Sequence, residues 1–311
     1  MENESVYEPG LVSIGLPVYN GGETLQRALD SLLNQTYRNT EVIISDNAST
    51  DGTQALCEGY ALRDPRIRYI RQAKNISQAP NMELVIHKAR GEYFMFGADD
   101  DFWHPTFIEK TKAVLDTHSA YGVAMSSISR RYDDGGEKDT VSYTDGLDLT
   151  HKSFPEVFNL MTTKRPIHLF FYGLMRTSLI QQLIRLPFPK SKAADRVFMI
   201  EMSLVTHFYP LSEILFEKTV SRQQVAERVK YKNDRIGRAF TDPKAHSRYV
   251  YAVVRRLVLS SSIPFLRKIA IYPYYLSVFL WNNRVFLREW FPSTFGLVLK
   301  VKAALRGIGY Y

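Results

Sequence analysis

The sequence predicts an α/β fold in which a mainly parallel sheet is flanked by helices. Short apolar, β-branched runs alternate with segments of helical period between residues 11 and 96, and this alternation is typical of successive βαβ units. Polar residues directly follow three of the apolar runs, at Asn20, Asp46 and Asp99. Parallel strands place their carboxyl ends at one edge of a sheet, so we expect a binding site at that edge.

The first two units are well marked. Residues 11–20 form a β-rich apolar run that contains Pro17 and ends at Asn20, and after two glycines the leucines recur with helical spacing. Those leucines are Leu25, Leu29, Leu32 and Leu33. A second buried strand is expected over residues 41–45, and the polar residues 46–53 then cap another helix.

Later elements follow the same alternation at first. We expect a third strand at 68–71, a helix at 79–89, a fourth strand at 93–96 and a helix opened by Pro105. Further along the chain we expect a strand at 121–129, a polar loop at 130–148 and a short helix at 151–161. The last expected elements are a strand-like run at 169–175, a helix at 197–207 and a strand at 214–220.

Three consecutive carboxylates, Asp99, Asp100 and Asp101, follow the apolar strand at 93–96. Adjacent carboxylates repel one another, so a fold keeps them together only if water or a positive charge compensates them. A hard divalent cation with oxygen ligands is the usual partner, and Mg²⁺ or Mn²⁺ is commonly bound with a phosphate. The alternative is a solvated, charged turn at the end of a strand.

Several motifs in this order resemble the family 2 glycosyltransferases with a GT-A, Rossmann-like fold. They are Pro17-Val-Tyr-Asn20, Asn34-Gln-Thr-Tyr37, Asp46 through Gly52, Asn75 with Asn81, and Gly91-Glu-Tyr93 before the Asp run. The resemblance covers roughly residues 10–225. It implies inverting transfer of a sugar from a nucleoside diphosphate donor, assisted by Mg²⁺ or Mn²⁺.

The resemblance also implies roles for individual residues on the donor side. Pro17, Tyr19, Asn20 and Glu23 would lie by the nucleotide, and Asp46 would accept a hydrogen bond from the base. Asn47 stands where many members have Asp, and a helix-capping role is the alternative for it. Asp99 and Asp100 would face the diphosphate, and Asp99 with Asp101 would hold the metal, because Ala98 stands where many members have the first Asp.

Two further residues complete the implied site. Asp195, at the head of a helical stretch, resembles the family's catalytic base, which takes the proton of the acceptor hydroxyl. An acid stabilised by the helix dipole would give the same sequence. Arg222 resembles a basic residue that reaches the diphosphate, and a solvent-exposed surface arginine is the alternative.

The charge is divided unevenly along the chain. Residues 1–217 carry 22 Lys+Arg against 28 Asp+Glu, whereas residues 218–311 carry 18 against 4. We therefore expect a catalytic domain at 1–225 and a helical, basic and aromatic appendage at 226–311. The uncharged run 269–283 is shorter than the about 20 residues that span a bilayer, which favours interfacial helices on an anionic membrane. Helices packed on the domain or in a homo-oligomer are the alternative.

These patterns favour a cytoplasmic enzyme, peripheral on the cytoplasmic face of the membrane. The N-terminus lacks the features of a signal peptide, and Cys57 has no cysteine with which to pair. The leading hypothesis is transfer from a nucleotide-sugar donor to a lipid-linked or cell-surface glycan. Transfer to a polyisoprenyl phosphate and a non-catalytic nucleotide-sugar-binding scaffold are the alternatives. No recognisable nucleic-acid module accompanies the basic tail, so we do not expect nucleic acid as a partner.

Overall fold

The computed structural model describes residues 7–134, 139–141, 166–188 and 194–222, together with 259–261, 263 and 265. Within these residues nine strands form one sheet in the order β3-β2-β1-β4-β8-β6-β9-β5, and β7 pairs with β6. The helix expected at 151–161 and nearly all of the basic appendage lie outside the described residues. No helix in the described ranges has the length and apolar character needed to cross a bilayer.

The first half of the sheet is parallel and matches the expected βαβ units. Its strands are β1 (Glu8–Val18), β2 (Thr40–Asp46), β3 (Ile67–Arg71) and β4 (Gly91–Phe96). Strand β1 lies between β2 and β4 and pairs with both in parallel. All seven residues of β2 are buried, as expected of a central strand covered on both faces.

The second half of the sheet is mixed. It contains β5 (Phe102–Trp103), β6 (Tyr121–Tyr132), β7 (Asp139–Val141), β8 (Leu174–Arg176) and β9 (His207–Val220). Strand β8 runs antiparallel to both β4 and β6, and β5 runs antiparallel to β9, whereas β6 and β9 are parallel. The sheet as a whole is therefore mixed but mostly parallel, as expected, and its antiparallel pairings involve the short strands β5, β7 and β8.

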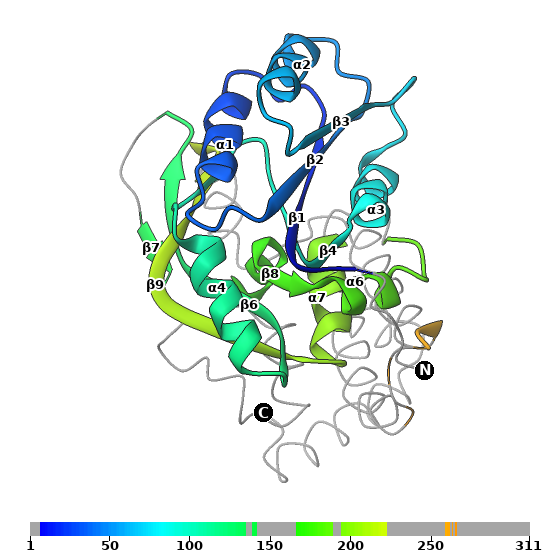
Figure 1. The fold of residues 1–311 in the computed structure, drawn as a ribbon, viewed down its shortest axis with the longest axis vertical. Coiled ribbons are helices and arrows are strands. Elements are labelled where there is room, and N and C mark those ends of the chain that lie inside the picture. Colours follow the sequence, from blue (N-terminus) through cyan, green and yellow to red (C-terminus); the bar gives the residue numbers. More distant parts are fainter. Residues whose placement is uncertain are drawn as a thin grey trace, which may run out of the picture.

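Helices cover both faces of the sheet (Figure 1). They are α1 (Thr24–Leu33), α2 (Thr53–Arg63), α3 (Gln78–Lys88), α4 (Phe107–Thr117), the 3₁₀ helix η1 (Pro166–Tyr172), α6 (Thr177–Leu183) and α7 (Ala194–Ser203). Helices α1, α2 and α4 lie on one face, and α3 and α6 lie on the other. The first four helices confirm the expected ones within a few residues.

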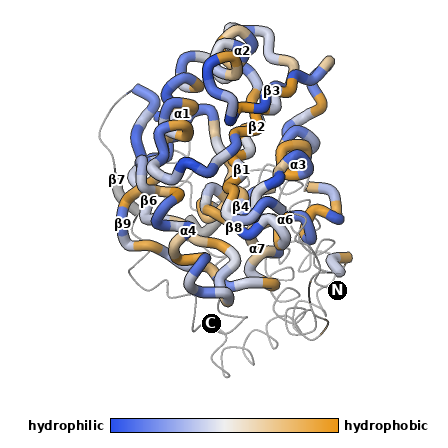
Figure 2. Tube along the Cα trace, in the orientation of Figure 1, coloured by the Kyte–Doolittle hydropathy of each residue, from blue (hydrophilic) through white to orange (hydrophobic). Residues whose placement is uncertain are grey.

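The core follows from the apolar strands. Figure 2 shows β1 and β2 as largely hydrophobic segments, with helices of mixed hydrophobic and hydrophilic residues around them. Gly15 in β1 is required by close packing, because a Cβ there would lie 2.6 Å from the ring of Phe94. Because Gly15 has no Cβ, Val85 of α3 can pack directly on the sheet.

Three sequence-based predictions were wrong in detail. The apolar run 169–175 divides into the end of η1 and the short strand β8, because an apolar run without clear periodicity does not distinguish helix from strand. The helix expected to reach residue 207 ends at Ser203, and His207 instead begins β9. Residues 130–132 and 139–141, expected in a loop, extend β6 and form β7.

Candidate active site

The strand register aligns three residues at the carboxyl edge of the parallel strands. Val18 of β1 is opposite Asp46 of β2, and Asp46 is opposite Arg71 of β3. Strand β4 ends at Phe96, opposite Gly15 of β1, and the Asp99–Asp101 run follows after two further residues. The parallel register therefore brings the carboxyl ends of these strands to one edge of the sheet, as predicted.

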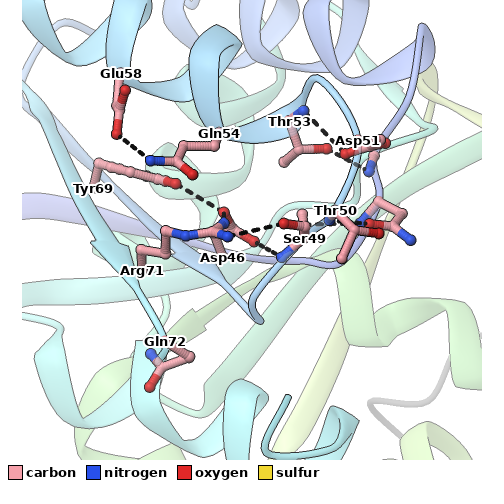
Figure 3. Close-up of polar contacts among 12 residues, drawn as sticks. Asp46, Ser49, Thr50, Asp51, Thr53, Gln54, Glu58, Tyr69, Arg71 and Gln72 are labelled. Atoms are coloured by element: carbon pink, nitrogen blue, oxygen red, sulfur yellow. Dashed lines mark hydrogen bonds and ion pairs between the residues drawn. The ribbon is translucent and has the colours of Figure 1, made fainter. Parts of the chain in front are cut away.

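Asp46 is completely buried and makes three hydrogen bonds (Figure 3). The backbone N–H of Ser49 donates to Oδ1 at 2.8 Å, while the Tyr69 hydroxyl and the Arg71 guanidinium donate to Oδ2 at 2.8 and 2.6 Å. Burial alone would raise the pKa of Asp46, but these hydrogen bonds outweigh it and hold the pKa below its ordinary value. Asp46 is therefore an ionised carboxylate held in a fixed orientation.

The loop after β1 is tied to the loop after β2. The backbone N–H of Asn20 donates to Ser49 Oγ at 2.9 Å, and Asn20 Oδ1 accepts from the N–H of Thr50 at 2.9 Å. The N–H of Gly21 donates to Thr53 Oγ1 at 2.9 Å. Asn20 adopts a left-handed conformation, with φ at 53°, which Asn tolerates better than most residues. The two loops therefore form one preorganised wall.

Asn47 links this wall to the segment before α3. Its Nδ2 donates to Asn75 Oδ1 at 3.2 Å, and its Oδ1 accepts from the N–H of Ile76 at 2.8 Å. Asn47 is almost fully buried. It thus joins two loops of the site and does not cap α2, for which Gly52 is the N-cap residue.

Three other predicted donor residues differ in their exposure. Tyr19 is 48% exposed at the end of β1, which leaves an aromatic face open to solvent. Glu23 is also exposed, immediately before α1, and Pro17 is half-buried within β1. An exposed aromatic side chain next to a rigid polar wall suits the stacking of a planar group.

Asp101 is held by strand β9. It is completely buried, its Oδ2 accepts from Lys218 Nζ at 2.8 Å, and its Oδ1 accepts from the N–H of Thr219 at 3.0 Å. The Thr219 hydroxyl also donates to the backbone carbonyl of Asp100. Both carboxylate oxygens of Asp101 therefore have protein partners, an arrangement that the sequence-based pairing of Asp99 with Asp101 as metal ligands did not include.

Asp99 and Asp100 are more open than Asp101. The Asp100 side chain is 43% exposed and lies 3.8 Å from Lys218 Nζ. Asp99 is half-buried, and burial, together with the charge of Asp100, raises the pKa of Asp99 to about 6. Three acids thus share one adjacent lysine, and two negative charges are left uncompensated at this point.

This donor set fits a divalent cation. Within the described ranges no three His, Cys, Asp or Glu side chains converge as a complete metal cage. Mg²⁺ commonly takes only one or two carboxylates from a protein and its other ligands from phosphates and water. Two partly open carboxylates with uncompensated charge match that pattern.

Tyr172 packs against Lys218, the lysine that pairs with Asp101. Lys218 Nζ lies 4.7 Å from the centre of the Tyr172 ring. Burial raises the pKa of Tyr172 to about 12, and the charges of Asp101, Asp195 and Asp100 add to the increase while Lys218 opposes it. Asp195 is in the first turn of α7, and its charge acts on Tyr172, as do those of Asp100 and Asp101.

Arg222 lies at the end of β9, where it is exposed. Its guanidinium forms an ion pair with Asp134, its backbone N–H donates to Asp133 Oδ1 at 3.0 Å, and it covers the ring of Tyr132 at 4.4 Å. In this arrangement Arg222 fastens β9 to the end of β6. A role at the diphosphate stays a prediction.

Sequence reasoning missed the residues that support the predicted ones. They are Tyr69 and Arg71 at Asp46, and Tyr172, Lys218 and Thr219 at the Asp run. Arg71 could have been suspected, because the expected third strand ends in a charged residue at the predicted edge. Lys218 is 117 residues from Asp101, and no pattern in the sequence joins them.

Comparisons with known proteins identify related sequences and folds. A model of the family described as Glycosyl transferase family 2 matches residues 13–184, more than half of the chain. Glycosyltransferase GlyG of Streptococcus pneumoniae serotype 4 is 33% identical over 99 residues, which are 32% of this chain and 33% of that protein. The putative glycosyltransferase EpsE of Bacillus subtilis is 35% identical over 113 residues, which are 36% of this chain and 41% of that protein. The matched part thus spans about a third to two fifths of these relatives.

Solved structures share the fold. Residues 1–349 of S. aureus TarS in complex with UDP-GlcNAc superpose with a TM-score of 0.63 at 18% identity, over 89% of this chain and 74% of that chain. The mannosyltransferase PcManGT from Pyrobaculum calidifontis, in complex with GDP-Man and Mn²⁺, gives 0.51 at 16% identity, over 94% and 86%. The described residues therefore have a GT-A-like α/β fold.

Proposed function

Because the chain belongs to glycosyl transferase family 2, we propose that it is an inverting glycosyltransferase that uses a nucleoside diphosphate sugar and a divalent cation. One observation carries the proposal. A rigid polar wall at the ends of β1 and β2 and two open carboxylates after β4 lie at one edge of the sheet, and helix α7 supplies a further carboxylate, Asp195. Such a set can bind a nucleotide, a metal diphosphate and an acceptor side by side.

The wall is the part proposed to hold the nucleotide. Pro17, Tyr19, Asn20 and Glu23 come from the β1 side, and Asp46 and Asn47 from the β2 side. The ionised Asp46 would accept a hydrogen bond from a base N–H, as the resemblance to the family implies. The exposed ring of Tyr19 is placed to stack on a base.

Asp99 and Asp100 would hold the Mg²⁺ or Mn²⁺ ion through their open oxygens. When bound, the cation neutralises the negative charge that develops on the diphosphate leaving group. The pairing of Asp99 with Asp101 stays an alternative, although Lys218 and Thr219 occupy both oxygens of Asp101. Arg222 would add positive charge for the diphosphate after releasing Asp134.

Asp195 is proposed as the general base. The acceptor hydroxyl oxygen forms a bond to the anomeric carbon as its proton passes to Asp195. The bond between the anomeric carbon and the diphosphate oxygen breaks, and its electron pair leaves with the nucleoside diphosphate. Attack opposite the leaving group inverts the configuration of the anomeric carbon.

The acceptor is proposed to be a lipid-linked or cell-surface glycan at the cytoplasmic face of the membrane. The proposal rests on the basic and aromatic composition of residues 226–311, which suits an anionic bilayer surface. A polyisoprenyl phosphate acceptor and homo-oligomer formation through the same region are the alternatives. A non-catalytic scaffold would bind the donor and leave it intact.

A thermal-shift screen of the full chain tests donor binding. UDP, GDP and their sugars with Mn²⁺ are the first choices, since TarS has been solved with UDP-GlcNAc and PcManGT with GDP-Man. A ligand at about 100 times its dissociation constant adds about 2.7 kcal/mol of stability. A rise in melting temperature that requires Mn²⁺ supports the proposal, and no rise with any nucleotide contradicts it. Donor cleavage in the same mixtures separates an enzyme from a scaffold.

A further inference from the structure

Strand β9 supplies the Asp run with a positive charge. Lys218 extends from β9 over the ring of Tyr172 and contacts two members of the run, Asp101 at 2.8 Å and Asp100 at 3.8 Å. The Lys218 side chain is 19% exposed. A lysine buried to this degree is costly unless it is paired, and here its partners are two carboxylates and an aromatic face.

The contact between Asp101 and Lys218 has the geometry of an ion pair. Burial alone would lower the pKa of Lys218, but Tyr172, Asp101 and Asp100 together raise it above the ordinary value. Burial of Asp101 acts in the opposite direction by raising the pKa of its carboxyl. The 2.8 Å contact and the hydrogen bond from the N–H of Thr219 favour the charged form of both partners.

Other charges near the cluster do not replace Lys218. The charge of Arg27 reaches Asp101, but the guanidinium of Arg27 pairs with Glu217 and lies over the Phe102 ring at 5.0 Å. Glu217 and Lys218 are neighbours in β9, so their side chains lie on opposite faces of the sheet. Among the described residues, Lys218 is the cation in direct contact with Asp100 and Asp101.

We propose that Lys218 is a positioning residue whose fixed charge orients Asp100 and Asp101 and sets how tightly the acid cluster binds a divalent cation. The proposal rests on the metal site in the proposed function. With Lys218 present, the three carboxylates of the run and the one ammonium group carry a formal net charge of −2. A cation on Asp100 would be repelled by the Lys218 ammonium, since that group is 3.8 Å from an Asp100 oxygen. Lys218 thus stabilises the empty site and weakens binding of the free metal.

Substitutions at the pair separate this role from a purely structural one. Lys218→Met keeps the stem of the side chain and changes the cluster charge to −3, so Mn²⁺ should bind at least about tenfold more tightly. Asp101→Asn changes the charge to −1 and should weaken Mn²⁺ binding by a similar factor. The double variant restores the charge to −2, and its affinity should return to within about threefold of the wild type.

The affinity is measured with Mn²⁺ alone by electron paramagnetic resonance on the full chain, with a melting curve for each variant. Lys110→Met is the matched control. It removes a lysine of α4 that pairs with Glu213, an exposed residue on β9, the strand that carries Lys218. It should leave Mn²⁺ binding unchanged. If Lys218→Met does not fold, the double variant is compared with Asp101→Asn, and removal of Lys218 must again tighten binding.

The outcomes distinguish this inference from the function on which it rests. Weaker Mn²⁺ binding in Lys218→Met, or equal affinity in all folded variants, would overturn the role of Lys218 and leave the metal site intact. Absence of Mn²⁺ binding by the wild type, with or without UDP and GDP, would overturn the metal site itself and this inference with it. Tighter binding in Lys218→Met, reversed in the double variant, is the result that the geometry requires.

Discussion

Replacement of Asp46 by Asn should loosen the wall on the nucleotide side. The Asn side chain can keep the hydrogen bond from the N–H of Ser49, but its amide N–H₂ would face the hydroxyl of Tyr69 and the guanidinium of Arg71. The main loss is one hydrogen bond between charged groups, which contributes about 1.5–3 kcal/mol. Solvent reaches a third of the Arg71 side chain, so we expect Asp46→Asn to lose about 2 kcal/mol at pH 7.

The pH dependence of this loss follows from the lowered pKa of Asp46. A carboxylate whose pKa is lower in the folded state contributes its full stability above the unfolded pKa of about 3.9 and loses it as the pH falls through the folded value. The wild type should therefore lose this contribution below about pH 4, whereas the Asn variant has none to lose. The difference in unfolding free energy between the two should be largest at pH 7 and should shrink toward pH 3.

Urea unfolding followed by tryptophan fluorescence measures both effects. Glu58→Gln is the matched control, because Glu58 is an exposed acid on the neighbouring α2 that accepts a hydrogen bond from Gln54 in Figure 3. Its unfolding free energy should stay within about 0.5 kcal/mol of the wild type. An Asp46→Asn variant as stable as the wild type at pH 7, or equally destabilised at pH 7 and pH 3, would refute the reasoning.

Three further predictions concern catalysis, the metal and the tail. Asp195→Asn should lower turnover by about 10²-fold or more with donor affinity retained, and steady-state kinetics with unchanged turnover would remove Asp195 as the base. Asp100→Ala and Asp99→Ala should each abolish the metal-dependent part of donor binding in calorimetry, whereas near-normal affinity in both would remove the metal assignment. Reversal of four basic residues of the tail to Glu should release the protein from anionic liposomes, since each contributes about 1 kcal/mol of attraction. A lower melting temperature or a split oligomer, with liposome binding weak from the start, would point to packing instead. The four residues are Arg267, Lys268, Arg284 and Arg288.

The parallel half of the fold could be predicted because its signals are local. The apolar runs that became β1, β2 and β4 end in residues that stop or redirect a strand, and helical spacing follows the first two. The carboxyl-edge rule then placed Asn20, Asp46 and Asp99 together without further information. Residues 169–175 could not be assigned in the same way, because every position is apolar or small and the run fits a helix and a strand equally.

The supporting contacts of the site could not be predicted, since they join distant segments. Lys218 and Thr219 reach the Asp run only after β9 pairs with both β6 and β5. Their pairing with Asp101 decides which carboxylates stay open, so counting acids in the sequence could not choose among the three. Arg71 likewise acquires its partner only through the register of β2 with β3.

Release of nucleoside diphosphate from a nucleotide sugar is the direct test of metal-dependent glycosyl transfer with Asp195 as the base. The full chain is incubated with UDP-GlcNAc and GDP-mannose, with Mn²⁺ or with a chelator, beside the Asp195→Asn variant, and the free diphosphate is measured. We expect metal-dependent release from one of the donors by the wild type and at least about 10²-fold less by the variant. Release that is equal with and without metal, or equal in the wild type and the Asp195→Asn variant, would contradict it.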